Sequence, residues 1–227
     1  MHPVPRCERQ QGLPPIDGHD ARSQVRPDHL VTFYEDGAFL ASSVSAFLLE
    51  GLRAGETVIV VAAPEHRAAF AAALEAAGHD AERSRRSGRY RELDAAETLA
   101  KLVPHGQLTA EGFEREVGRL VETTAAAAQG LRIYGEMVAL LWQAGALDLA
   151  LELEDRWNAL LERVPVPLLC GYPLSAFDTA ETTARFHDVC GRHSIVTTDS
   201  YASLGRPGDA TSGVVMLGAR EPGGCQN

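Results

Sequence analysis

Lysine is almost missing from this chain: Lys101 is the only one in 227 residues, and the formal net charge is -10. Proteins that bind nucleic acid without a specific base code neutralise its phosphates with clustered Lys and Arg side chains. The acidic balance therefore argues against nucleic acid as a direct partner.

A phosphate-binding loop is also missing. The apolar stretch 29–34 is followed by Glu35, Asp36 and Gly37, and the chain then continues with a helical pattern. A nucleoside triphosphate needs a glycine-rich loop, a lysine for the outer phosphates and a Ser or Thr for magnesium at such a junction. Two carboxylates stand there instead, so the sequence argues strongly against P-loop phosphoryl chemistry. With no other catalytic motif recognisable, we expect that the protein is not an enzyme.

Long hydrophobic runs are absent. No apolar stretch approaches the roughly 18 residues that a membrane-spanning helix needs. The amino-terminal sequence MHPVPRCERQ has no apolar core of a secretion signal. We expect a cytoplasmic protein with no membrane partner.

Cysteine is scarce and unpaired, with no CxxC among the four: Cys7, Cys170, Cys190 and Cys225. This spacing predicts neither a disulfide framework nor a structural zinc site. Cys170 follows a predicted buried strand and is either a redox-sensitive thiol or, the favoured interpretation, an inert buried one.

One pattern on a predicted helix suggests metal ligands. His187, Cys190 and His193 are three residues apart and share a helix face. No fourth ligand stands at a recognisable spacing. We therefore expect neither a metal nor a cofactor.

What the chain does contain is an alternation of short apolar runs and longer helical patterns, typical of an α/β fold. Strands are expected at 29–34, 57–62, 89–95, from 131, from 167 and at 194–198. Helices are expected at 39–54, 65–77, 97–103, 109–128, 146–162 and 178–191. The segment that begins as a strand at 131 is expected to pass into a further helix that ends at 142. The alternation predicts a three-layer α/β/α domain with a mostly parallel central sheet over residues 28–201. Residues 1–27 and the glycine-rich 202–227 are predicted to be tails.

Ligands of parallel sheets bind outside the carboxyl ends of the strands, so the residues after each strand are the candidate binding site. Aromatic rings there can line an apolar pocket, and carboxylates can accept hydrogen bonds from a ligand. The candidate ligand-binding residues are Tyr34, Glu35, Asp36, Glu136, Trp142 and Tyr172. Each also has a purely structural interpretation: Glu35 and Asp36 as helix caps, Glu136 as a partner of the following helix, and the three aromatic residues as core.

Seven segments in order resemble the MEDS family, the methanogen/methylotroph, DcmR sensory domain. They are HLVTFYED (29–36), FLLEGLRAGETVIVVAAPEH (47–66), LDAAETL (93–99), IYGEMVALLW (133–142), LELEDRWNALL (151–161), LLCGYPLSAF (168–177) and VCGRHS (189–194). The resemblance implies a degenerate RecA/KaiC-like domain without the Walker A motif. It also implies a noncatalytic sensor of a small molecule, such as a hydrocarbon derivative.

The resemblance further implies a regulatory protein partner of the histidine-kinase, anti-sigma or transcription-factor type, which here is expected to act in trans. A homo-oligomer is left open. Two other functions remain as alternatives. One is residual nucleotide binding in the same crevice, and the other is a protein-interaction scaffold that binds no ligand.

Overall fold

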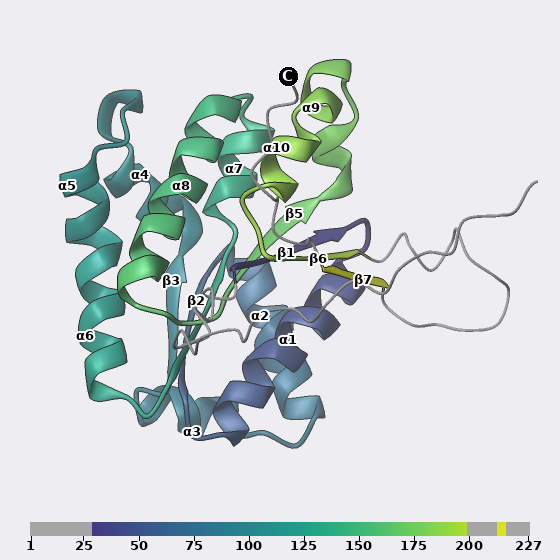
Figure 1. The fold of residues 1–227 in the computed structure, drawn as a ribbon. Helices are drawn as coiled ribbons and strands as arrows, with labels where there is room; N and C mark the ends of the chain where they lie inside the picture. Colours follow the sequence, from purple (N-terminus) through teal and green to yellow (C-terminus); the bar gives the residue numbers. More distant parts are fainter. Residues whose placement is uncertain (1–28, 199–212, 217–227) are drawn as a thin grey trace, which may run out of the picture.

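The computed structural model describes residues 29–198 and 213–216 (Figure 1). The predicted amino-terminal tail, 1–27, lies outside the described residues. So does the predicted tail 202–227, except for the short strand at 213–216. The sequence analysis did not anticipate that strand.

The core is a seven-stranded sheet in the order β3-β2-β4-β5-β1-β6-β7. Every pairing is parallel except that of β7 with β6, which is antiparallel. The strands are β1 (His29–Tyr34), β2 (Thr57–Ala62), β3 (Tyr90–Asp94), β4 (Leu131–Gly135), β5 (Leu168–Pro173), β6 (Ile195–Thr198) and β7 (Gly213–Met216). The predicted fold class, an α/β/α domain with a mostly parallel central sheet, is confirmed.

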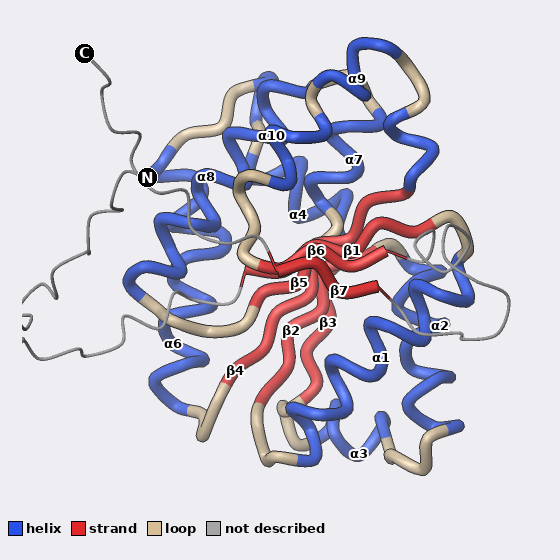
Figure 2. The backbone as a smooth tube through the Cα atoms, turned by 45° about the vertical axis from the view of Figure 1, so that its right-hand side comes forward, coloured by secondary structure: helices blue, strands red, loops and turns tan. Residues whose placement is uncertain are grey.

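Helices cover both faces of the twisted sheet (Figure 2). The first face carries α1 (Gly37–Arg53), α2 (Pro64–Ala76) and α3 (Ala81–Arg86). The second carries α4 (Ala95–Leu102), α5 (Ala110–Phe113), the π-helical turn η2 (Glu114–Gly118), α6 (Arg119–Ala127), α7 (Met137–Gln143), α8 (Leu147–Arg163), α9 (Ala180–Ala184) and α10 (Phe186–Cys190). Two short 3-10 turns, η1 (Pro104–Gly106) and η3 (Leu174–Phe177), lie in connections.

Strand β2 shows why the chain folds in three layers. All six of its residues are buried, and successive side chains of a strand point to opposite faces. Val58 and Val60 accordingly pack with α1 and α2, while Ile59 and Val61 pack in the larger core under α7 and α8. A continuous apolar run is thus what a strand covered on both faces requires.

Three details differ from the expected helices. The helix predicted at 109–128 is divided by the π-helical turn η2, and the helix predicted at 178–191 breaks at Arg185 into α9 and α10. Helix α3 was missed because six mostly polar residues show no apolar period.

No helix among the described residues is long and apolar enough to cross a membrane.

Candidate functional site

The carboxyl ends of β1, β2 and β4 meet around one buried carboxylate. Glu136 directly follows β4 and is 3% exposed. Its Oε1 accepts a hydrogen bond from the backbone N–H of Ala63 at 2.5 Å. Its Oε2 lies 3.1 Å from the donating hydroxyl of Tyr134 and 2.7 Å from Nδ1 of His66. The carboxylate is therefore bonded to the end of β2, the start of α2 and its own strand.

The outer side of this site is formed by Tyr34 and His66, whose ring centroids are 6.2 Å apart. The His66 side chain is 26% exposed. Its hydrogen bond to Glu136 raises the pKa of His66. Burial, and next the charge of Glu136, raises the pKa of Tyr34 to about 12. A protonated phenol and a protonatable imidazole thus stand between Glu136 and solvent. We call Tyr34, His66, Tyr134 and Glu136 the Glu136 cluster.

The junction between β1 and α1 is only two residues long, Glu35 and Asp36. Asp36 caps the helix: its Oδ1 accepts the N–H of Ala38 at 2.9 Å, and its carbonyl accepts the N–H of Leu40 at 3.1 Å. Glu35 is exposed. The junction is too short for a loop that wraps a phosphate, and a side chain of the protein already occupies one of the helix amides that an anion would use.

Trp142 and Tyr172 lie elsewhere, in the core on the second face of the sheet. Trp142 is 2% exposed and Tyr172 0%, and their rings meet edge to face with centroids 5.9 Å apart. The indole Nε1 donates to the carbonyl of Ala176 at 2.9 Å. The Tyr172 hydroxyl donates to Glu154 at 2.8 Å. A ligand reaches these two side chains only if this aromatic core opens.

The six predicted site residues therefore do not line one pocket. The structure places Tyr34 and Glu136 together, Glu35 and Asp36 at the helix cap, and Trp142 and Tyr172 in the core. Ligand contact by any of them stays a prediction.

The sequence analysis missed His66. It stands four residues after the end of β2, in the first turn of α2, so it reaches the same edge of the sheet as Glu136. Its position after a buried strand was the available signal. Tyr134, near the end of β4, was not among the six candidates either. Strand alternation directs it to the first face, where its ring packs against Phe70.

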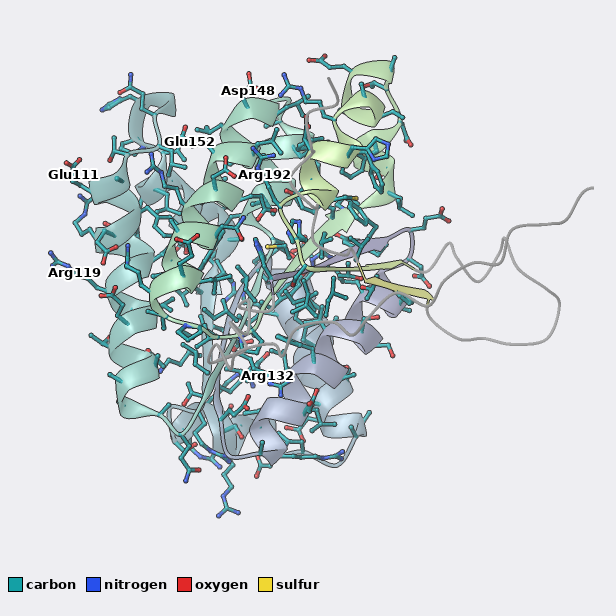
Figure 3. The ribbon with its side chains drawn as sticks, in the orientation of Figure 1. Glu111, Arg119, Arg132, Asp148, Glu152 and Arg192 are labelled. Atoms are coloured by element: carbon teal, nitrogen blue, oxygen red, sulfur yellow. The ribbon has the colours of Figure 1, made fainter. Side chains whose placement is uncertain are left out.

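Two surface hollows lie away from the Glu136 cluster. One, of about 390 Å³, is lined by α5, η2, α6 and the end of α8. Its arginines include Arg163, which pairs with Glu114 and Glu122. The other, of about 320 Å³, lies where β2 and β3 begin. Figure 3 marks Glu111 and Arg119, which line the first hollow, on the outer helices.

Among the described residues, one group of side chains has the composition of a metal site: His29, Glu154, Cys170 and His193. Burial, and then the nearby Glu154, raises the pKa of the Cys170 thiol well above its usual range. The helical grouping suggested by the sequence does not form. His187 is exposed and Cys190 is half-buried, while His193 turns into the core.

The fold and the β1–α1 junction define a three-layer α/β/α domain with a mostly parallel sheet and no phosphate loop. The chain belongs to the MEDS family, the methanogen/methylotroph, DcmR sensory domain, whose family model matches residues 28–193. The resemblance carried by the seven sequence segments is thereby confirmed.

No curated protein matches the chain significantly. Among solved structures it is similar to the KaiC-like protein PH0186 from the hyperthermophilic archaeon Pyrococcus horikoshii OT3. The two share 17% sequence identity, with a TM-score of 0.48 over 75% of this chain and 72% of that one.

Proposed function

We propose that this chain is a noncatalytic sensory domain that binds a small, weakly polar molecule at the Glu136 cluster. The observation that carries the proposal is the position of Glu136 at a topological switch point. β2 continues into α2 on the first face, whereas its neighbour β4 continues into α7 on the second. Ligands of open α/β sheets bind in the crevice that such a divergence creates.

The chemistry of the cluster favours a neutral ligand that carries oxygen or halogen. His66 and Tyr34 offer hydrogen-bonding groups beside apolar ring surface. The surroundings disfavour anions, because the acidic Glu35, Asp36 and Glu65 stand at the same edge. Membership in a sensory family supports a signalling role, and small hydrocarbon derivatives suit the polarity of the cluster.

The hydrogen bonds of Glu136 provide a route for the signal. The carboxylate bonds to Ala63 at the start of α2, and its own backbone leads into α7. A ligand that competes for His66 changes how firmly these two helices are joined at opposite faces of the sheet. Small changes of this kind are read by a partner as a shift between two packed arrangements. The partner is a regulatory protein of the histidine-kinase, anti-sigma or transcription-factor type.

The test is ligand-dependent thermal stability of the full chain. Methanol, formaldehyde, dichloromethane and acetate are added separately, as is ATP with magnesium. A compound present at 100 times its Kd stabilises the fold by about 2.7 kcal/mol. We expect one of the neutral compounds to raise Tm, and we expect acetate and ATP to leave Tm unchanged.

Two variants assign the effect to the site. Glu136→Gln removes the charge at the centre of the cluster, and we expect it to abolish the rise in Tm. Glu111→Gln makes the same change on an exposed side chain of α5 and should leave the rise unaltered (Figure 3). Magnesium-dependent stabilisation by ATP would instead support the nucleotide-binding alternative.

A second candidate, a ligand-free interaction scaffold, is favoured by the burial of Trp142 and Tyr172 in the core. The same experiment separates it from the sensor. A scaffold shows no change in Tm with any compound, and its behaviour toward a partner is insensitive to Glu136→Gln.

A further inference from the structure

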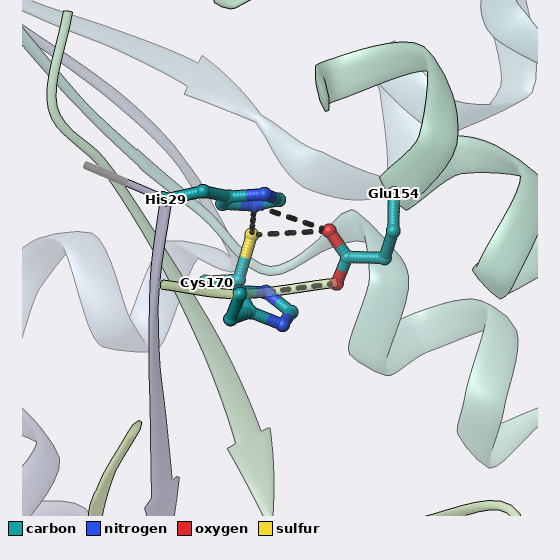
Figure 4. A group of neighbouring side chains, drawn as sticks. His29, Glu154 and Cys170 are labelled. Atoms are coloured by element: carbon teal, nitrogen blue, oxygen red, sulfur yellow. Dashed lines mark hydrogen bonds and ion pairs between the residues drawn. The ribbon is translucent and has the colours of Figure 1, made fainter. Parts of the chain in front are cut away.

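Four metal-ligand side chains converge from four separate segments of the second face of the sheet (Figure 4). His29 begins β1, Glu154 lies in α8, Cys170 lies in β5, and His193 precedes β6. None is more than 5% exposed. No other group of this kind occurs in residues 29–198 and 213–216.

The hydrogen bonds of His29 fix which of its nitrogens carries hydrogen. Asn158 donates its amide N–H to the carbonyl of Arg192 at 3.1 Å, so its Oδ1 faces His29 as an acceptor at 2.9 Å. Nδ1 of His29 must therefore be the donor. In the neutral ring Nε2 then presents a lone pair to Sγ of Cys170 at 3.4 Å and to Oε2 of Glu154 at 3.3 Å.

The same reasoning applies to His193. Its Nδ1 lies 2.7 Å from the carbonyl of Val189, which can only accept, so Nδ1 carries the hydrogen. Nε2 is buried and has no hydrogen-bond partner among the described residues. It lies 3.5 Å from Oε1 of Glu154. A lone pair thus faces a carboxylate oxygen.

The hydroxyl and thiol protons of the cluster do not supply a hydrogen-bond donor to every lone pair in it. The Tyr172 hydroxyl donates to Oε1 of Glu154 at 2.8 Å. The Cys170 thiol has one proton, which it can give to Oε2 of Glu154 at 3.6 Å or to His29 at 3.4 Å. Neither proton reaches Nε2 of His193. Buried lone pairs that converge without a donor are destabilising, and a cation between them relieves this.

We propose that His29, Glu154, Cys170 and His193 bind one divalent transition-metal ion of the zinc type. Bonds of about 2.0–2.3 Å in a tetrahedron place ligand atoms about 3.3–3.6 Å apart. The three contacts among Nε2 of His29, Sγ of Cys170 and Oε2 of Glu154 span 3.3 to 3.6 Å. Nε2 of His193 lies 3.5 Å from the other carboxylate oxygen, Oε1 of Glu154. All four ligand atoms lie within 4.8 Å of one another, so the widest gap closes with a movement of roughly 1 Å.

The surroundings match those of a metal-binding histidine pair. Ligating histidines donate their other ring N–H to a carbonyl or carboxylate oxygen, which fixes the tautomer. Oδ1 of Asn158 accepts this N–H from His29, and the carbonyl oxygen of Val189 accepts it from His193. Two imidazoles and a thiolate select borderline transition metals over magnesium or calcium. On binding, Cys170 releases its proton to solvent and forms the sulfur–metal bond as thiolate.

The site is closed by four protein ligands and is buried, which is the pattern of a structural ion. It joins β1, β5, α8 and the start of β6. This inference departs from the sequence-based expectation of no metal, and it does not depend on the proposed ligand at the Glu136 cluster.

The test is cobalt titration of the full chain after treatment with a chelator. Co²⁺ bound to a thiolate gives a charge-transfer band in the near ultraviolet, and Zn²⁺ should displace it. We expect one ion per chain. Cys170→Ser should abolish the band, and His193→Gln should weaken Co²⁺ binding by more than the roughly 10- to 100-fold that loss of an outer-shell partner causes. Asn158→Ala should weaken Co²⁺ binding by roughly 10- to 100-fold, because Asn158 is an outer-shell partner.

Matched controls come from the helical pattern that the structure separates from the site. Cys190→Ser and His187→Gln should leave the stoichiometry and the band unchanged. In case Cys170→Ser does not fold, a variant with serine at Cys7, Cys190 and Cys225 keeps Cys170 as the single thiol. It should retain the full band.

Two results overturn the proposal. One is a wild-type chain, folded by circular dichroism, that takes up neither Co²⁺ nor Zn²⁺. The other is a charge-transfer band that disappears in the variant with Cys170 as its single thiol, because the sulfur ligand then lies elsewhere.

Discussion

Glu136 and Glu154 are two buried carboxylates with opposite surroundings. Donors meet Glu136 from a backbone amide, a tyrosine hydroxyl and an imidazole that is partly exposed. Glu154 is 0% exposed, and two of its closest neighbours are imidazole nitrogens whose hydrogens point the other way. A carboxylate can be buried where donors surround it. Glu154 accepts the Tyr172 hydroxyl, but two imidazole lone pairs also face it, and a cation between these groups would stabilise them. The first cluster therefore suits a reversible ligand and the second a resident ion.

The largest expected effect separates these two carboxylates by stability. Glu154→Ala should lower the free energy of unfolding by about 3–5 kcal/mol, because removing one member of a buried charged group leaves the others uncompensated. Glu136→Ala should cost about 1–3 kcal/mol, the penalty for leaving Ala63 N–H and the Tyr134 hydroxyl without an acceptor. Urea unfolding of both variants measures the difference.

The control for this comparison is Glu152→Ala. Glu152 lies on the same helix as Glu154, in an ion pair with Arg156, and its side chain is 43% exposed (Figure 3). Its loss should change stability by no more than about 0.5 kcal/mol. Equal losses for Glu136→Ala and Glu154→Ala would remove the distinction between the clusters.

A matched pair of hydroxyl deletions sharpens the comparison. Tyr172→Phe removes the hydroxyl that donates to Glu154, and Tyr134→Phe removes one of several donors to Glu136. We expect about 1.5–3 kcal/mol for Tyr172→Phe, as for a hydrogen bond to a charged group, and about 0.5–1.5 kcal/mol for Tyr134→Phe. Urea unfolding measures both losses of unfolding free energy. A larger loss for Tyr134→Phe than for Tyr172→Phe would contradict the stronger dependence of Glu154 on its hydroxyl donor.

The fold was largely predictable because its signals are local. The apolar run of β2 and the acidic residues after β1 can be read from adjacent residues, and the β2 run is present as expected. The junction at Glu35 and Asp36 is shorter than expected, because α1 begins at Gly37 rather than at residue 39. The position of Glu136 at a strand end was predictable for the same reason. A residue that directly follows a parallel strand lies at the edge of the sheet where the strands end, and its place after the strand can be read from the sequence.

The buried cluster was not predictable because nothing local connects positions 29, 154, 170 and 193. The pairing of β1 with β5 brings His29 and Cys170 together, and α8 then lays Glu154 over them. The i, i+3 spacing instead pointed to His187, Cys190 and His193, and the turn after α10 takes His193 away from that face. Sequence spacing finds ligands on one helix, whereas this group depends on strand register.

The smallest expected effect concerns the pH dependence of the Glu136 cluster. The hydrogen bond to Glu136 raises the pKa of His66 in the folded state. A raised folded-state pKa stabilises the fold below the unfolded value of about 6.5, and this contribution is lost as pH rises through the folded pKa. The wild type should therefore lose stability relative to Glu136→Gln as pH increases from 6 to above the His66 pKa.

Proton NMR titration of the His66 ring measures the cause directly. In Glu136→Gln the His66 pKa should fall toward its ordinary value. The shift should be partly screened by salt because the His66 ring reaches solvent. An unchanged His66 pKa would mean that Glu136 is held by the Ala63 amide and Tyr134 alone. A ligand that displaces His66 would then have no effect on the two helices that Glu136 joins.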